Sequence, residues 1–583
     1  GANNALTVSS GGLTTVGGTV SGLTSLGITG AATLSGGAIA SSGAQTYGGA
    51  VTLGADTTLS GSAVSFNATV NGASALTVNA SGLTTFGAAV GGTTELTSLS
   101  TDAGGGTRLG GNVSTSGAQT YGDAVTLTAN GVLSASAVDF ADTLDGARTL
   151  AVNAAGLTRF GAAVGATTAL TSLTTDAAGS TQLVGNVATT GAQTYNDALT
   201  LAGDATLTAS AVAFASTVDG ARDLVVNASG ITSFGAAVGG TTALTSLTTD
   251  AAGSTTLPGA VTTSGAQTYN DAVTLSAATA LNASALSFND DLAAGAFALT
   301  TRSNALTLAG TVTGSGAVDI ATATAGASLG LAGGAGTLQL SSALLAKLQP
   351  FATLTLGRSD GTGTLTAGTA SSDFTLPTNT TLTGDTAQVN LNGDLIGAGH
   401  TLAITTGGRT TVASSLTGLA SLSIAADTRL NGAVVSTTGA QTYGGELALG
   451  GDSSLNASAL SLGSLAGGTH DLTMRSNALT LAGGATGSGA LDLAPSAAGT
   501  SIGIAGAAGT LQVSAGLLAE LSSFGSLTLG RSDGTGTLSA NAFSLPTATT
   551  LHTDTAVIAL NGDITGANNA LTVSSGGLTT VGG

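Results

Sequence analysis

The stretch GAQTYGGAVTL at residues 43–53 decides how this chain is expected to fold, because its first five residues recur throughout the sequence. All five tyrosines of the protein stand in this same pentapeptide, GAQTY. Tyr47 and Tyr121 are 74 positions apart, and the next two copies keep that spacing. A fixed period of this kind indicates a repeat architecture. The tyrosines are Tyr47, Tyr121, Tyr195, Tyr269 and Tyr443.

Phenylalanines follow the same 74-residue period in two series. One series is Phe66, Phe140, Phe214 and Phe288, and the other is Phe86, Phe160 and Phe234. The motifs TYGGAV, SFNATV and TFGAAV begin at Thr46, Ser65 and Thr85, so each aromatic residue follows the previous one after 19 or 20 positions.

Short alternating runs such as ALTVNA separate these motifs and are typical of β-strands bounded by Gly, Asn or Asp. A strand pattern that returns after 19–20 residues predicts one coil of a parallel β-helix, with about three short strands per coil. We expect four coils in each 74-residue repeat. The sequence also predicts that aromatic rings of successive coils stack inside, at Tyr47, Phe66, Phe86, Tyr121, Phe140, Phe160, Tyr195, Phe214, Phe234, Tyr269, Phe288 and Tyr443.

A second, larger repeat follows the first array. RSNALTLAG begins at Arg302 and again at Arg475, and residues 566–583 duplicate residues 1–18, which suggests a unit of 565 residues that recurs in a longer protein. We therefore expect five regions along an all-β solenoid. They are coils that continue a preceding repeat (1–42), the array of 74-residue repeats (43–290), the first copy of the larger repeat with a short helix (291–396), coils with one GAQTY unit (397–465), and the second copy of the larger repeat (466–583).

Two segments depart from the strand pattern. SSALLAKLQPF (341–351) and SAGLLAELSSF (514–524) carry Leu at helical spacing. Each predicts a short helix beside the solenoid, and a helix that binds a partner is the alternative.

Composition excludes several classes of protein. Charged residues make up 7% and aromatic residues 3% of the chain, too few for an ordinary globular domain. Hydrophobic residues reach 42%, which argues against disorder. The net charge of −19 argues against nucleic acid, and we find no apolar run of about 18 residues that would insert into a membrane. Without cysteine, the chain offers no disulfide framework and no thiolate metal site.

Residues that could carry chemistry are sparse. The three histidines are His400, His470 and His552, and the position equivalent to His400 near the start of the chain is Asn4. The adjacent Asp290 and Asp291 would point to opposite faces of a strand, so a role in capping turns is expected. TDAGGGTRL (101–109) and GRSDGTGTL (357–365) mix Asp with Gly as calcium repeats do, but neither repeats back to back. We expect no enzyme activity, no cofactor and no metal.

The segments GAQTYNDAVTL, SFNATVNGASALTVNASGLTTFGAAVGGTT and LTSLTTDAAGSTTL resemble the repeats of filamentous-haemagglutinin-like exoproteins. The two segments that contain LLAKLQPFATLTLGRSDGTGTL and LLAELSSFGSLTLGRSDGTGTL also resemble that family's short helix followed by a strand. The resemblance implies a right-handed parallel β-helix, two-partner secretion from a Gram-negative bacterium, and an extracellular or cell-surface location.

The first functional expectation is a stalk of a large adhesin, for attachment, cell–cell contact or biofilm. The alternative is a self-assembling fibre, sheath or surface layer. An ice-binding solenoid would need a Thr-x-Thr array on every coil, which occurs here only sporadically. Expected partners are adjacent repeats, further copies of the chain, and host or neighbouring-cell surfaces or matrix polysaccharide.

Overall fold

The computed structural model describes residues 4–582 and is all-β, with 52% of residues in strands and 2% in helices. Parallel strands stack coil upon coil into a β-solenoid of about 29 coils, as the sequence predicts. The chain forms two compact units, one up to residue 293 together with 309–311, the other comprising 294–308 and the residues from 312 onward. Among the described residues, no helix has the length and apolar character needed to cross a membrane.

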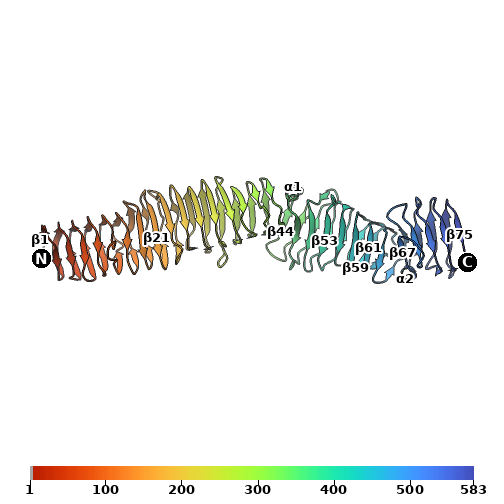
Figure 1. Cartoon of the computed structure of the whole chain (residues 1–583), viewed down its shortest axis with the longest axis horizontal. Helices are drawn as coiled ribbons and strands as arrows, with labels where there is room; N and C mark the ends of the chain where they lie inside the picture. Colours follow the sequence, from red (N-terminus) through yellow and green to blue (C-terminus); the bar gives the residue numbers. More distant parts are fainter. Residues whose placement is uncertain (1–3, 583) are drawn as a thin grey trace. The chain divides into compact units, whose positions relative to one another are not determined.

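A coil of the first unit, shown in red to yellow-green in Figure 1, consists of three short strands joined by corners. Strands β6 (Ala44–Tyr47), β7 (Val51–Leu53) and β8 (Thr57–Gly61) make one coil, and β9 (Ala63–Phe66), β10 (Val70–Asn71) and β11 (Ala75–Ala80) make the next. Each strand pairs in parallel with the strand three places later, β6 with β9, β7 with β10 and β8 with β11. We call the faces that contain β6, β7 and β8 face 1, face 2 and face 3.

Side chains alternate between the interior and the surface along these strands. In β9, Val64 and Phe66 are buried while Ala63 and Ser65 are partly exposed. This period of two follows from the pleat, which turns successive side chains to opposite sides of a strand. Since the pairing is in register, an inward residue lies directly above an inward residue of the preceding coil.

The 74-residue repeat does not contain a whole number of coils. Following the register up face 1 from Tyr47 reaches the strand of Tyr269 after eleven coils. Those two tyrosines are 222 positions, or three repeats, apart. The mean coil is therefore about 20 residues, within which single steps vary, for example 23 from Phe86 to Leu109 and 18 from Leu109 to Leu127.

The expected four coils per repeat are wrong, because each repeat makes three and two-thirds coils. Eleven strand positions, counting the single bridge at Val90, separate the start of one repeat from the next, and eleven is not a multiple of three. Each repeat therefore begins two faces further on than the last. The GAQTY strands β6, β16 (Gln119–Tyr121), β26 (Ala192–Tyr195) and β36 (Ala266–Tyr269) lie on faces 1, 3, 2 and 1.

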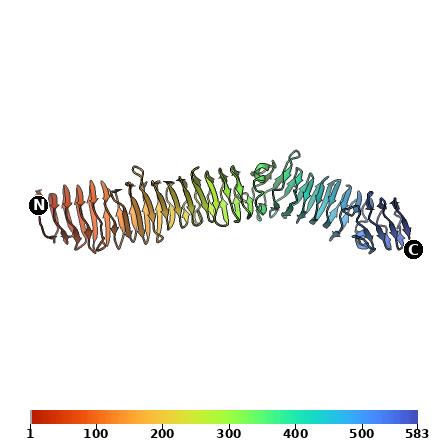
Figure 2. The ribbon, with the colours of Figure 1, turned by 45° about the horizontal axis from the view of Figure 1, so that its top comes forward.

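The second unit stacks in the same way, as the green to blue coils of Figure 2 show. It also contains two excursions, which are longer segments of chain between one strand and the strand that pairs with it on the next coil. Strand β44 (Ala317–Ala321) pairs with β47 (Thr353–Gly357) 36 positions later, and β65 (Ala490–Ala494) pairs with β68 (Ser526–Gly530) after the same interval. The extra residues include the two expected helices, α1 (Ser342–Ala346) and α2 (Ala515–Glu520).

Both helices begin in the same way and pack on their own solenoid. The hydroxyls of Ser341 and Ser514 accept hydrogen bonds from the N–H groups of Leu344 and Leu517, at 3.2 and 3.1 Å. Such N-caps satisfy donors that the first helical turn leaves without a partner. Leu345 in α1 is buried, as are Leu348 and Phe351 just after it, so this segment contributes apolar side chains to the core.

A recurring glycine controls the approach of neighbouring coils in the first unit. Gly105, Gly179 and Gly253 occupy the same repeat position and have φ of +80°, +74° and +76°. A Cβ at Gly179 would collide with the carbonyl oxygen of Gly156 on the preceding coil. Glycine is required here both by the left-handed backbone and by the lack of space.

We predict that Gly179→Ala destabilises the surrounding coils by at least about 2 kcal/mol, from left-handed strain plus the clash. Gly259→Ala is the matched control, because a Cβ there meets nothing within 4 Å. Hydrogen exchange should show faster opening of β23 (Ser172–Thr175) and β24 (Ser180–Leu183) in the first variant alone. Equal exchange in both variants would contradict this role for Gly179.

Candidate functional site

The predicted aromatic residues form short ladders inside the first unit. Tyr47 stacks on Phe66 and Phe66 on Phe86, with ring centroids 5.1 and 5.3 Å apart and planes within 14° of parallel. In-register strands impose this arrangement, because equivalent inward positions of successive coils lie above one another. The remaining ladders have centroid distances between 5.0 and 5.5 Å and contain Tyr121, Phe140 and Phe160, then Tyr195, Phe214 and Phe234, then Tyr269 and Phe288.

Tyr443 is buried in the second unit but has a different environment. Its Cα partners in the neighbouring strands are Ile424 on one side and Leu462 on the other. The GAQTY unit at this place is followed by a strand with Leu where the array has Phe, so the tyrosine packs against aliphatic side chains. Rings in both units are no more than 2% exposed at the twelve predicted positions.

The glutamine of GAQTY has a role that sequence reasoning missed. The Gln45 side-chain amide is fully buried and donates to the carbonyl oxygens of Ile39 and Ser60, at 3.1 and 2.8 Å. The Tyr47 hydroxyl in turn donates to Gln45 Oε1 at 3.0 Å. Ile39 and Ser60 belong to neighbouring strands of face 3, so the amide joins two coils at the corner. We call this arrangement the Gln–Tyr clasp.

The same clasp recurs in every copy of the pentapeptide, with Gln119, Gln193, Gln267 and Gln441 as the buried amides. The spacing of the glutamine and the tyrosine could have predicted this role. A polar residue two positions before an inward tyrosine on a strand must also point inward, and a buried amide needs partners.

We predict that Gln193→Met costs more stability than Tyr195→Phe. The first change removes both hydrogen bonds to the carbonyls of Val187 and Thr208 and the acceptor of the tyrosine hydroxyl. Each buried group left without a partner costs about 1–3 kcal/mol, whereas the second change loses one hydrogen bond. Denaturant unfolding with hydrogen exchange of the neighbouring strands would measure both, and an equal loss would contradict the clasp.

Three aspartates are buried at the corner that follows the tyrosine. Asp123, Asp197 and Asp271 are at most 3% exposed. The hydroxyls of Thr101 and Thr107 donate to one carboxylate oxygen of Asp123, at 3.0 and 2.8 Å, and two threonines do the same for each of the other aspartates. Burial raises the pKa of each carboxyl, which the threonine hydrogen bonds partly oppose. Gly49 and Gly445 stand at this position in the other two copies.

These buried carboxyls predict a pH dependence of stability. A folded-state pKa above the unfolded value means that ionisation opposes folding, so this cost is absent at low pH and grows as pH rises through the raised pKa. We expect the triple variant Asp123→Asn, Asp197→Asn, Asp271→Asn to have a higher melting temperature than the parent. The difference should increase as the pH is raised from about 4 to about 7.

Circular dichroism melts at several pH values would test this expectation. The gain should persist in about 0.5 M salt, because screening acts mainly on exposed charges. A difference between the two proteins that stays constant across the pH range would rule out the assigned cause.

Most acidic and amide residues at exposed corners join one coil to the next. Asp56 accepts a hydrogen bond from the Ala75 N–H at 2.8 Å, and Asp204 accepts one from the Asp223 N–H at 3.1 Å. Asp291, one of the adjacent pair, accepts from the Thr311 N–H at 2.7 Å, and its own N–H donates to the Asp290 carboxylate at 2.8 Å. Much of the negative charge therefore satisfies backbone donors between coils.

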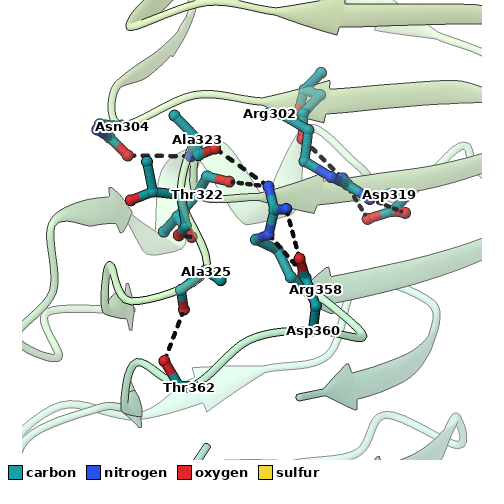
Figure 3. A network of polar contacts seen from close by, with 11 residues as sticks. Arg302, Asn304, Asp319, Thr322, Ala323, Ala325, Arg358, Asp360 and Thr362 are labelled. Carbon is teal, nitrogen blue, oxygen red and sulfur yellow. Dashed lines mark hydrogen bonds and ion pairs between the residues drawn. The ribbon is translucent and has the colours of Figure 1, made fainter. Parts of the chain in front are cut away.

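In the second unit, two arginine–aspartate pairs hold the corner around GRSDGTGTL (Figure 3). Arg302 donates to both carboxylate oxygens of Asp319, at 2.9 and 2.8 Å, and Arg358 does so with Asp360, at 2.8 and 2.9 Å. Arg358 also donates to the carbonyl oxygens of Thr322 and Ala323. The second copy repeats these contacts with Arg475, Asp492, Arg531 and Asp533.

The aspartates of the two Asp-Gly segments, which resemble calcium repeats, accept hydrogen bonds from protein groups. The Asp360 carboxylate faces a guanidinium, whose hydrogen bonds lower the pKa of that carboxyl, and in the second copy they lower the pKa of Asp533 to about 2. In TDAGGGTRL, Asp102 accepts a hydrogen bond from the Ala80 N–H at 3.0 Å. Among residues 4–582, no group of three or more acidic, histidine or cysteine side chains is placed to hold one metal ion.

The histidines lie on separate coils of the second unit. His470, whose side chain is 36% exposed, has its Nδ1 3.7 Å from Oδ1 of Asp452. His552 belongs to the surface-facing positions of β71 (Thr549–Thr553). His400 is different, because it lines a pocket of about 450 Å³ beside α1 together with Asp373.

Comparison with known proteins does not extend these observations. The chain matches no protein-family model, no curated protein and no solved structure.

Proposed function

We propose that this chain is a stalk segment of a large bacterial adhesin that is displayed outside the cell. The observation that supports the proposal best is the use of its recurring residues. Aromatic rings, glutamines and corner aspartates each serve contacts between one coil and the next. In a solenoid of this kind every added repeat lengthens the structure through the same local contacts, which suits reach more than recognition.

The location and the absence of enzyme activity belong to the same proposal. The repeats resemble those of filamentous-haemagglutinin-like exoproteins, which supports an extracellular site on a Gram-negative bacterium. The histidines stand on separate coils, and Asp360 and Asp319 are each held by an arginine, which favours a structural function over catalysis.

The rotation of the repeat disfavours the alternative of a laterally packed fibre or sheath. Leu157 and Ile231 occupy equivalent repeat positions and are 42% and 56% exposed. They lie on faces 3 and 2, on strands β22 (Leu157–Phe160) and β32 (Ile231–Phe234), because each repeat starts on a different face. Equivalent surface residues therefore return to one face only after three repeats, and a lateral contact could not recur from one repeat to the next.

Deletion of residues 48–269 in the full-length protein of its native host tests the stalk proposal. This deletion removes three repeats, or eleven coils, so the remaining strands keep their faces. It shortens the solenoid by about 50 Å at the usual strand spacing. We expect surface display to persist while attachment of cells to a coated surface falls.

A variant with the exposed Leu157→Ser change is the matched control and should attach normally. Accessibility to an added protease on intact cells measures display. A chain that is protected from the protease, or unchanged attachment after the deletion, would overturn the proposal.

A further inference from the structure

The pocket beside α1 lies wholly within the second unit and brings together residues from three places in the chain. Ser342 and Gln349 come from the helical segment, Asp373 precedes β49 (Phe374–Thr375), and His400 precedes β53 (Thr401–Thr405). Leu376 and Pro377 add an apolar part to the wall. The volume of about 450 Å³ falls in the range of small-molecule sites.

The polar side chains in this pocket have unused hydrogen-bonding capacity. Within residues 4–582, no hydrogen bond or ion pair to protein engages the side chains of Ser342, Gln349, Asp373 or His400. This differs from the corner aspartates elsewhere, such as Asp56 and Asp204, whose carboxylates accept backbone N–H groups of the next coil. The pocket thus offers a carboxylate, an amide, a hydroxyl and an imidazole to a ligand.

Asp373 stands at the end of an ordered insertion. The first copy of the larger repeat has four more residues here than the second, between the shared strands β48 (Leu365–Ala367) and β49. Ser372 accepts a hydrogen bond from the Thr369 N–H at 2.7 Å and donates to the Ala332 carbonyl at 3.1 Å. These contacts fix the segment immediately before Asp373.

The second copy keeps the frame of the pocket but has neither its carboxylate nor its imidazole. Leu545 and Pro546 match Leu376 and Pro377, and the left-handed Ala567 (φ 48°) matches Ala398 (φ 50°). The Asn541 side-chain amide donates to the Ala505 carbonyl, as the Ser372 hydroxyl does to the Ala332 carbonyl. The residues that correspond to Ser342, Gln349, Asp373 and His400 are Ala515, Ser522, Ala542 and Asn569. Folding therefore does not require these partly or fully exposed side chains, which leaves them available to a ligand.

We propose that the pocket beside α1 binds a neutral saccharide unit. A carboxylate and an amide suit the paired donors and acceptors of sugar hydroxyls, and Leu376 and Pro377 provide an apolar surface for the C–H side of a sugar ring. Anionic ligands are disfavoured, because Asp373 lines the pocket, no lysine or arginine does, and the chain carries a net charge of −19. Organic cations are less favoured, because the lining includes no Trp, Tyr or Phe and its one aromatic side chain is the imidazole of His400.

Saturation-transfer NMR on the full chain tests this site. The probes are the methyl glycosides of glucose, galactose and mannose, N-acetylglucosamine, and sialic acid as the anionic comparison. We expect at least one neutral probe to bind, and titration calorimetry should show at least tenfold weaker binding for Asp373→Ala and for His400→Asn. The second change installs the residue that the other copy already tolerates at Asn569.

Asn569→Ala in the second copy is the matched control and should leave binding unchanged. Unaltered circular dichroism of each variant separates loss of binding from loss of folding. Binding of none of the neutral probes, preferential binding of sialic acid, or neutral-probe binding that survives both pocket substitutions would overturn the proposal. Because surface display and attachment are measured separately, a failure here would leave the stalk proposal standing.

Discussion

Parallel backbone hydrogen bonding between successive coils is the constraint on which the other features of this structure depend. It holds neighbouring strands about 4.8 Å apart and in register, so each inward side chain must sit on its counterpart in the next coil. A flat ring tolerates this spacing well, and the ladder of Tyr47, Phe66 and Phe86 follows. Leucine and valine fill most of the other inward positions, which explains how a chain with 3% aromatic residues still forms a continuous core.

Corners present the main difficulty of such a fold, because the ladder of backbone hydrogen bonds is interrupted where the chain changes face. The chain satisfies these groups with side chains. Gln45 supplies buried donors to two carbonyls, while Asp56 supplies an acceptor for an N–H on the next coil. At the corner around Arg358, a guanidinium that is hydrogen-bonded to Asp360 donates to backbone carbonyls in the same way. Net negative charge is thus largely a consequence of how corners are closed.

Comparison of the two copies of the larger repeat distinguishes the residues that maintain the structure from those that line the proposed ligand site. Both retain the capped helix, the arginine pairs and the left-handed alanines, which keep the excursion in place. Only the first retains Asp373 and His400 at the pocket. A scaffold of this type tolerates such divergence, because each coil contacts only its neighbours and a change at one corner is not transmitted along the stack.

The sequence by itself determined the fold class, the ring positions and the two short helices, because periodicity and alternation are local properties that parallel stacking preserves. Tertiary structure alone decided the face on which each repeat begins. Each repeat makes three and two-thirds coils because some steps between coils are longer than others, such as the step from Phe86 to Leu109. It also decided that the Gln45 amide reaches the carbonyl of Ser60, 15 positions away, and that the Asp123 carboxylate accepts from Thr107 and Thr101, 16 and 22 positions away. The pocket beside α1 arises in the same way, because Gln349, Asp373 and His400 approach one another only when separate coils stack.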